Sequence, residues 1–412
     1  MMQNNDISII WASFLMKVVG LWLARNRNEQ RRRDFALIYT VGALFISICI
    51  AIRDIYHTWG NFGVSAVFIC CNILYVTIVF LKIGVIYKHK IEFFDLIRFT
   101  EKNFWRPYHD PQEILVVADC KRIWYIFAST AYLYTQLRYH TLLRKIRFYR
   151  SANIGRNESD RILPFNLWVD FPVGMSPYFE ILFILCVYHV GVCYICFDNL
   201  LCIVNLHVAS QFRILQHRLR SIDNATKDQI EEHESDAKLS YYSNMCYTKL
   251  KNCVQQHQML IEYCKKLENI FTLIVLAQVM FLAMVLCLVG FQLLLVKNQS
   301  SQICIFLVLN LCGVLCQLLM FTYSCDDLMR QSVNVGNATF SGPWPILPMN
   351  EAGATVRKNL LIIIMRSHKI CCITAGKFFP VSLQTFTGVI VLGTAMSYFT
   401  LLRNTSMDAT NS

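Results

Sequence analysis

The residues between 374 and 403 form an apolar stretch long enough to cross a bilayer, yet they include many hydroxyl and amide side chains. Polar and apolar members recur at steps of three and four residues: Gln384, Thr387, Val391, Thr394, Tyr398 and Leu401. This spacing predicts one mostly polar stripe along a helix. In a membrane the stripe could line a water-filled ion path that Leu401 closes by dewetting. Alternatively, its hydroxyls could hydrogen-bond between helices of one subunit.

Two other groups of reactive side chains lie in an earlier apolar run. Glu180, His189 and Asp198 are nine residues apart, so successive members fall about half a turn out of phase and do not make one catalytic face. We expect them to pack or to line a pocket rather than to relay protons. Cys193 and Cys196 have zinc-pair spacing without a second pair, which favours helix packing.

The motifs of common enzymes are absent from the sequence. It contains no zinc-protease, phosphate-loop, nucleophile-elbow or dinucleotide-binding motif. We therefore expect no enzyme activity, no metal and no cofactor.

The composition is typical of a protein that crosses a membrane several times. Of the 412 residues, 55% are apolar and only 16% charged, and the mean hydropathy is +0.40. The net charge of +12 would suggest nucleic acid in a soluble chain, but no nucleic-acid-reading module accompanies it. We expect basic loops beside membrane lipid and no nucleic-acid partner.

Seven apolar runs predict an all-α membrane protein with seven transmembrane helices. They are residues 36–55, 62–86, 123–142, 173–206, 268–296, 302–323 and 378–402. An eighth apolar stretch, residues 7–24, is interrupted by Ser8, Ser13 and Lys17 and predicts an interfacial or re-entrant helix, with a spanning segment as the alternative.

The distribution of basic residues predicts the orientation. With a cytoplasmic N-terminus, 27 Lys and Arg residues lie on the cytoplasmic side and 10 outside, so the C-terminus is extracellular. Among the sequons, Asn157 is the expected glycosylation site. Helical patterns in 207–267 and a separate helix over 355–372 predict a cytoplasmic anchor bundle. Pro380 fits the start of the last spanning helix.

These predictions divide the chain into seven segments. They are a cytoplasmic N-terminus (1–35), four transmembrane helices (36–206), helical extensions (207–267), two further transmembrane helices (268–323), a cytoplasmic anchor segment (324–377), a pore-lining helix (378–403) and an extracellular tail (404–412).

Three stretches of the second half carry a family resemblance. Residues 365–403 read MRSHKICCITAGKFFPVSLQTFTGVIVLGTAMSYFTLLR and closely resemble the C-terminal signature of insect odorant receptors. The stretches LKNCVQQHQMLIEYCKKLENIF (250–271) and SCDDLMRQSVNVGNATFSGPW (324–344) resemble the segments around the family's fifth and sixth helices. The first half agrees mainly in its layout of spans.

The resemblance implies a ligand-gated, non-selective cation channel of four subunits in the plasma membrane of a sensory neuron dendrite. It implies that this chain is an odorant-tuning subunit working with the family's shared coreceptor, because the 207–267 stretch is too short for the coreceptor's extended loop. By position, Leu401 matches the hydrophobic gate, Tyr398 its neighbour and Asn404 a polar position outside it. The chain departs from the coreceptor in having Leu rather than Val at the gate and Arg403 close by.

The resemblance also implies an odorant pocket in the outer half of the membrane. With the predicted orientation, the outer halves of the second to sixth spans contribute Phe68, Asn72, Tyr132, Tyr134, Met175, Phe179, Phe183 and Phe306. Aromatic and Met side chains make adaptable apolar walls, which would suit a small, uncharged volatile ligand.

Two other classes of receptor are alternatives. A gustatory-type channel has the same architecture, but its usual Thr-Tyr-x-x-x-x-x-Gln-Phe pattern is absent from the last span. A metabotropic seven-helix receptor would place the C-terminus in the cytoplasm.

Overall fold

The structure is a computed structural model in which almost every described residue is helical. It describes residues 7–22, 24, 26–58, 64–104, 110–152, 176–222, 236–295, 301–342 and 351–410. In chain order, the structure begins with the helices α1 (Ile7–Val19), α2 (Arg27–Thr58), α3 (Val64–Lys88), α4 (Lys90–Asn103) and α5 (Pro111–Ala152). The remaining elements are α6 (Ser176–Arg220), α8 (Asp236–Leu295), α9 (Ser301–Phe340), α10 (Glu351–Ser367), the strands β1 (Thr374–Ala375) and β2 (Phe379–Pro380), and α11 (Leu383–Thr410).

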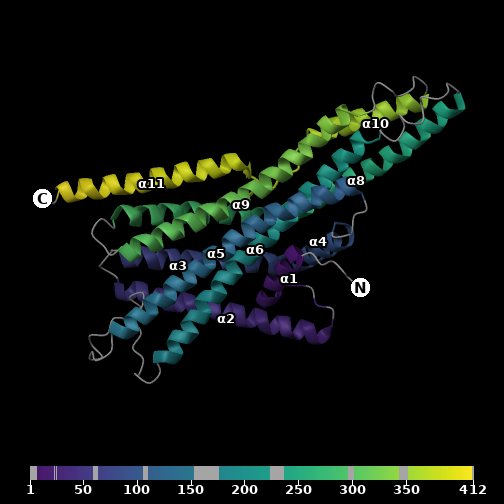
Figure 1. Cartoon of the computed structure of the whole chain (residues 1–412). Coiled ribbons are helices and arrows are strands. Elements are labelled where there is room, and N and C mark those ends of the chain that lie inside the picture. The colour runs from purple at the N-terminus through teal and green to yellow at the C-terminus, as the bar shows by residue number, and fades with distance from the viewer. Residues whose placement is uncertain are drawn as a thin grey trace.

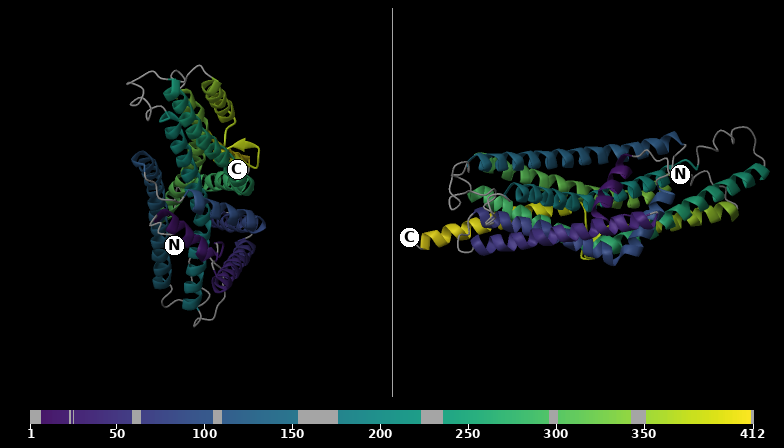
Figure 2. Two further views of the ribbon diagram at one scale, coloured as in Figure 1. Left: turned by 90° about the vertical axis from the view of Figure 1, so that its right-hand side faces the viewer. Right: turned by 90° about the horizontal axis from the view of Figure 1, so that it is seen from below.

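The helices form one elongated bundle (Figures 1 and 2). α10 and the first part of α8 project together from one end, whereas α11 runs out at the opposite end. α6 lies in the interior, where its residues from Val190 to Leu219 are largely buried, and it packs chiefly against α9. The bundle core is therefore built on the α6–α9 pair.

Five helices among the described residues contain stretches long and apolar enough to cross a membrane. The stretches are Arg27–Arg53, Ile69–Lys88, Tyr188–Arg220, Met245–Leu293 and Leu307–Phe340. Of the other two predicted spans, 123–142 falls within α5, whereas 378–402 lies in α11 only from Leu383 onward. The prediction of an all-helical membrane fold is confirmed in its architecture.

Helix starts follow local capping chemistry where the sequence supplies it. Asp110 precedes Pro111, and its carboxylate accepts a hydrogen bond from the Gln112 amide at 3.0 Å. Proline at the first helical position loses no bond, and an acidic cap satisfies a free amide of the first turn. These residues explain why α5 begins at Pro111.

Two predicted boundaries differ from the structure. Pro380 does not begin a helix: it lies in β2, opposite Thr374, and α11 begins at Leu383 and continues to Thr410. The helix predicted over 355–372 is α10, which begins at Glu351 and ends at Ser367. Both differences arise because the chain between Lys369 and Ser382 forms a docked hairpin instead of continuing two helices.

α1 has one face against the bundle and one exposed. Ala12, Leu15, Met16 and Val19 are buried, mainly against α6, while Ile10 and Phe14 are about half exposed. α1 is thus an amphipathic helix attached to the bundle side.

Candidate functional site: the C-terminal helix and the polar groups behind it

The polar stripe of α11 faces away from the protein. Gln384, Thr387, Val391 and Thr394 are all exposed, Val391 at 65%. The Thr387 hydroxyl donates to the Gln384 carbonyl at 2.9 Å, and the Thr394 hydroxyl bonds within its own helix at 3.0 Å. Among the described contacts, these hydroxyls do not join α11 to another helix.

The opposite face of α11 packs on α8. Val389 is buried, and Ser397 donates to the Cys287 carbonyl of α8 at 3.0 Å. At Gly393 a Cβ atom would lie 3.1 Å from the Leu286 Cβ, so glycine allows a closer approach than a larger residue would. The helices pack closely where α11 carries small residues, which is typical of membrane helix interfaces.

The other three positions predicted for the pore or gate belong to the C-terminal part of α11. Tyr398, Leu401 and Asn404 lie on the helix, but their side chains are outside the described residues. Asn157, the predicted glycosylation site, is also outside the described part of the chain.

A short β-hairpin whose strands are joined by residues 376–378 leads into α11. Gly376 and Lys377 have φ of 60° and 64°, and the Phe378 amide donates to the Ala375 carbonyl at 3.0 Å. Positive φ at both central residues is the pattern of a tight β-hairpin turn. The turn reverses the chain so that it enters the last helix from the side of α8.

Thr272 of α8 holds this hairpin. Its hydroxyl donates to the Thr374 carbonyl at 3.0 Å and accepts from the Lys377 amide at 3.2 Å, and its carbonyl accepts from the Gly376 amide. The Thr374 hydroxyl in turn donates to Glu268 at 2.6 Å. The hairpin before α11 is therefore tied to α8 by hydrogen bonds of both backbone and side-chain atoms.

Two adjacent carboxylates of α9 extend this network. Asp326 accepts from the Leu383 amide at 3.3 Å, so a negative charge lies at the N-terminal end of α11, where the helix dipole favours it. Asp327 forms a 2.6 Å ion pair with Arg213 of α6. These two residues belong to a stretch quoted above for its resemblance, but spacing alone did not reveal their roles.

A buried ion pair lies behind α11 in the bundle core. Lys82 of α3 and Asp198 of α6 are 2.6 Å apart, and their side chains are 0% and 3% exposed. Gln317 of α9 donates to the second oxygen of Asp198. The Lys82 ammonium also lies 4.7 Å from the centre of the Tyr194 ring. Both charges are thus compensated by direct partners.

Aromatic rings connect this pair to α8. Tyr75, Tyr194 and Phe281 make mutual edge contacts with centroids 5.0 to 5.5 Å apart. Gln278 of α8 donates to the Tyr194 hydroxyl at 3.2 Å. Three helices, α3, α6 and α8, therefore meet at this cluster.

The ionisable residues singled out from the sequence do not form a relay in the described structure. His189 bonds to Thr40 of α2 at 2.9 Å, separately from the Asp198 ion pair. The side chain of Glu180 is outside the described residues. Cys193 and Cys196 are buried, and the Cys196 thiol donates to the Cys193 carbonyl. His189, Asp198 and the two cysteines are therefore packed between helices, as the sequence predicted.

Of the eight predicted ligand-binding side chains, the structure describes two. Asn72 is half-buried on α3, and Tyr132 is 56% exposed on α5. Met175 and the side chains of Phe68, Tyr134, Phe179, Phe183 and Phe306 lie outside the described residues. The predicted ligand pocket stays a prediction.

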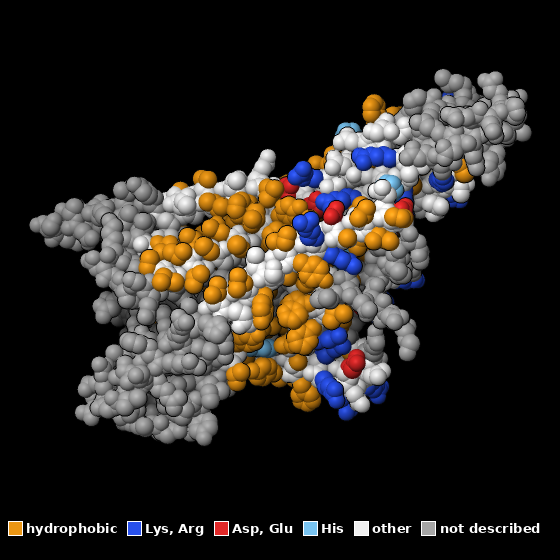
Figure 3. Space-filling model, in the orientation of Figure 1, with side chains coloured by type: hydrophobic (Ala, Val, Ile, Leu, Met, Phe, Trp, Pro, Cys, Tyr) orange, Lys and Arg blue, Asp and Glu red, His pale blue; other side chains and the backbone are white. Residues whose placement is uncertain are grey.

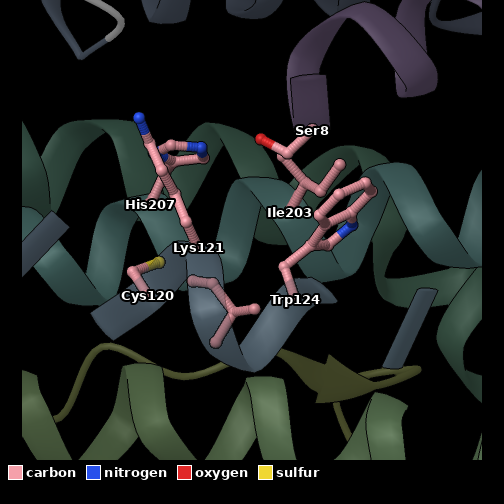
Figure 4. Close-up of a pocket in the computed structure, with 7 residues that line it drawn as sticks. Ser8, Cys120, Lys121, Trp124, Ile203 and His207 are labelled. Carbon is pink, nitrogen blue, oxygen red and sulfur yellow. The ribbon is translucent and has the colours of Figure 1, made fainter. Parts of the chain in front are cut away.

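A small hollow lies elsewhere, between α1, α5 and α6 (Figure 4). Its lining consists of Ser8, Cys120, Lys121, Trp124, Ile203, Leu206 and His207. Trp124 donates to Asn199 of α6 at 2.9 Å, which fixes α5 against α6. The hollow has no enclosed room for a water molecule and shares no residue with the predicted ligand site.

The fold defines an all-helical, multi-pass membrane protein, and its last helix has a polar outer face. A family model described as 7tm Odorant receptor matches residues 106–392. The chain belongs to this odorant receptor family.

Two curated relatives illustrate the similarity. The chain is 23% identical to Odorant receptor 13a of Drosophila melanogaster, over 98% of this chain and 96% of that protein. It is 27% identical to Odorant receptor Or2 of Anopheles gambiae, over 59% of this chain and 61% of that one.

The fold is similar to a solved receptor structure. The olfactory receptor OR5 of Machilis hrabei in complex with eugenol superposes with a TM-score of 0.72 at 14% identity, covering 95% of this chain and 97% of that one. The same receptor described without eugenol gives a TM-score of 0.71.

Proposed function

We propose that this chain is the odorant-binding, tuning subunit of a ligand-gated, non-selective cation channel. The observation that carries the proposal is the arrangement of α11. Its polar stripe is exposed while its other face is fixed on α8. A spanning helix with an exposed polar face needs water or another subunit opposite that face. Four such helices around an axis would supply both.

In this arrangement the stripe lines the conduction path. Thr387 and Thr394 would present hydroxyl oxygens and Val391 an apolar step along it. Leu401 would form the hydrophobic constriction, with Tyr398 beside it and Asn404 just outside. Opening requires that ligand binding favour the state in which these constricting residues are apart.

The proposed orientation places α10 and the start of α8 in the cytoplasm. On the face shown in Figure 3, Lys and Arg side chains border the hydrophobic surface on the side toward α10. Basic residues concentrate on the cytoplasmic side of membrane proteins. The chain would then be a plasma-membrane protein with its C-terminus outside, as expected for a sensory neuron dendrite.

The proposed ligand is a small, uncharged volatile molecule bound in the outer half of the membrane. A solved receptor of similar fold is described in complex with eugenol, a small aromatic molecule. The residues proposed for the walls are the eight predicted above, from Phe68 on α3 to Phe306 on α9. Their mostly aromatic character suits an apolar ligand.

A shared coreceptor is the proposed partner in a heterotetramer. α6 ends at Arg220 and α8 begins at Asp236, so the connection between them is short. The coreceptor is expected to carry an extended loop there, which supports a tuning role for this chain.

Whole-cell current tests the proposal. Cells would express this chain alone, the coreceptor alone, or both, during exposure to a panel of volatiles that includes eugenol. A rapid cation current specific to the co-expressing cells is the expected result. Leu401→Ala should raise the current measured without ligand, with Met396→Ala as a control on an exposed apolar residue of the same helix.

Two outcomes would contradict the proposed function. With surface expression verified, the absence of any volatile-evoked current in every combination would contradict the odorant assignment, and soluble tastants would then test a gustatory-type channel. A tag after Ser412 that is detected only in permeabilised cells would contradict the proposed orientation and favour a metabotropic receptor.

A further inference from the structure

The corner between α1 and α2 combines an exposed apolar face with a cluster of arginines. On α1, Ile10, Trp11 and Phe14 are 53%, 41% and 53% exposed, and Lys17 continues the same side of the helix. Residues three and four apart share a helix face, so these side chains form one amphipathic stripe. Such a stripe is typical of helices that lie at a membrane interface.

A tight turn holds this helix against α2. Gly20 has φ of 88°, and a Cβ atom there would lie 2.4 Å from the Arg33 carbonyl oxygen and 2.6 Å from the Leu37 amide nitrogen. Only glycine can occupy this position, both for its backbone angle and for the space. α1 is therefore fixed directly beside the arginines of α2.

The first eight residues of α2, Arg27–Asp34, are strongly basic. They contain four arginines, at positions 27, 31, 32 and 33, and two carboxylates, Glu29 and Asp34. Gln30 donates to Asp34 at 2.8 Å, and Arg33 is 3.5 Å from Glu29. Arg27, Arg31 and Arg32 are exposed, so the net positive charge faces outward.

Arg33 has a hydrogen-bond donor that no described residue accepts. Its side chain is only 11% exposed, and Nη1 is buried without a hydrogen-bond partner among the described residues. A buried donor of a charged group without an acceptor is costly, so a turn of the guanidinium toward an anion at the corner would be favoured because it supplies the acceptor.

The arginines also lie where the membrane-facing surface begins. Directly after Asp34, Phe35 and Ile38 are 72% and 67% exposed, and Tyr39 and Phe45 continue this apolar surface along α2. Figure 3 shows Lys and Arg side chains beside hydrophobic ones at the lower right of the face, where α2 begins. A boundary between basic side chains and an exposed apolar surface is where phospholipid headgroups are expected to meet acyl chains.

We infer that the α1–α2 corner binds the phosphate of an anionic phospholipid of the cytoplasmic leaflet. The guanidinium of Arg33 would hold the phosphate, the exposed Arg31 and Arg32 would add positive charge around it, and Trp11 and Phe14 would lie against the acyl chains. The planar guanidinium matches phosphate oxygens in geometry and charge. The assignment to the cytoplasmic leaflet rests on the orientation proposed above, but the binding site does not depend on channel activity.

Lipid binding to the purified full-length chain tests this inference. The chain would be placed in nanodiscs of phosphatidylcholine with increasing phosphatidylserine, and bound phosphatidylserine would be counted by native mass spectrometry. Arg33→Gln should weaken binding about fivefold, the effect of one basic residue near an anionic surface. Arg33→Lys should recover only part of the loss because it keeps the charge without the guanidinium fork.

The matched control is Arg98→Gln on α4, which removes one exposed arginine that already pairs with Asp95 at 3.5 Å. It should leave phosphatidylserine binding unchanged. Thermal unfolding of each variant in phosphatidylcholine alone would exclude a folding defect.

Three results would overturn the inference. The first is equal binding by the wild-type chain and Arg33→Gln. The second is an equal loss with Arg98→Gln, which would show only a general charge effect. The third is displacement of the lipid by inorganic phosphate at similar affinity, which would identify a free-anion site. None of these results bears on whether the chain forms a channel.

Discussion

Polar side chains are buried and paired in the bundle core around Lys82, but they are exposed on the outer face of α11. In the core, the ammonium of Lys82 and the carboxylate of Asp198 are buried together, with Gln317 as a further partner. On α11, Thr387 and Thr394 bond only to carbonyls of their own helix among the described contacts and are exposed. The charges of Lys82 and Asp198 are paired within one chain, whereas the outer face of α11 is exposed in the single chain.

This difference separates two reasons for polar residues in a membrane protein. Paired groups such as Lys82 and Asp198 fix how helices meet, and they need no solvent. A polar face that is open in the single chain requires water or a second subunit. Changes in the core should therefore alter folding, whereas changes on the stripe should alter the assembled protein.

The largest effect is expected from breaking the buried pair. Lys82→Met leaves the carboxylate of Asp198 buried without its cation, and this should lower the free energy of unfolding by about 3–5 kcal/mol. The double variant Lys82→Met/Asp198→Leu should recover most of the loss, since two apolar residues replace two charges. Thermal unfolding in one detergent measures all three proteins.

The control for this experiment is the exposed pair Asp95–Arg98, whose side chains are 66% and 70% exposed. Arg98→Met should cost under about 1 kcal/mol. If Lys82→Met cost no more than this control, the core would not depend on its ion pair.

A smaller effect on stability is expected where α11 packs on α8. Gly393→Ala would bring a Cβ to 3.1 Å from the Leu286 Cβ and should destabilise the chain by about 1–3 kcal/mol. Gly388→Ala, where nothing lies within 4 Å, should stabilise it by about 0.5–1 kcal/mol because alanine favours helix. Parallel unfolding curves of the two variants measure the contrast, and equal shifts would contradict the close approach of α11 to α8.

A substitution in the hairpin before α11 is expected to stabilise the protein. Lys377 has φ of 64°, a conformation that costs a side chain about 1 kcal/mol, whereas glycine adopts it freely. Lys377→Gly should therefore raise the free energy of unfolding by up to about 1 kcal/mol. Lys369→Gly, outside the turn, serves as the comparison, and a gain at both positions would argue against strain at Lys377.

The smallest effect on stability is expected on the exposed polar stripe of α11. Thr387→Val and Thr394→Val should change the free energy of unfolding by less than about 0.5 kcal/mol, because the side chains are exposed. In channels formed with the coreceptor, they should lower the single-channel conductance by removing oxygens from the path. Unchanged conductance in the double variant would place the stripe outside the pore.

The sequence predicted the helical fold because apolar runs of membrane length have few other solutions. It also predicted the stripe on α11, since a helix period is a local property. It did not predict that Lys82 meets Asp198, because the two are 116 residues apart and only the packing of α3 against α6 joins them.

The chain between α10 and α11 shows a second limit of sequence reasoning. Pro380 was expected at a helix start, which its fixed φ favours. The hydrogen bonds from Thr272 and the turn at Gly376 and Lys377 place it in a strand instead. These contacts come from α8, about a hundred residues earlier, so no local pattern contains them.

The attachment of α11 to α8 at two places has a mechanical consequence. Thr272 holds the hairpin at one end, and the Cys287 carbonyl binds Ser397 further along. The two points are fifteen residues apart on α8, or about 22 Å along its axis. We expect α8 and α11 to move together: a tilt of about 5° about Thr272 would move the attachment at Ser397 by about 2 Å.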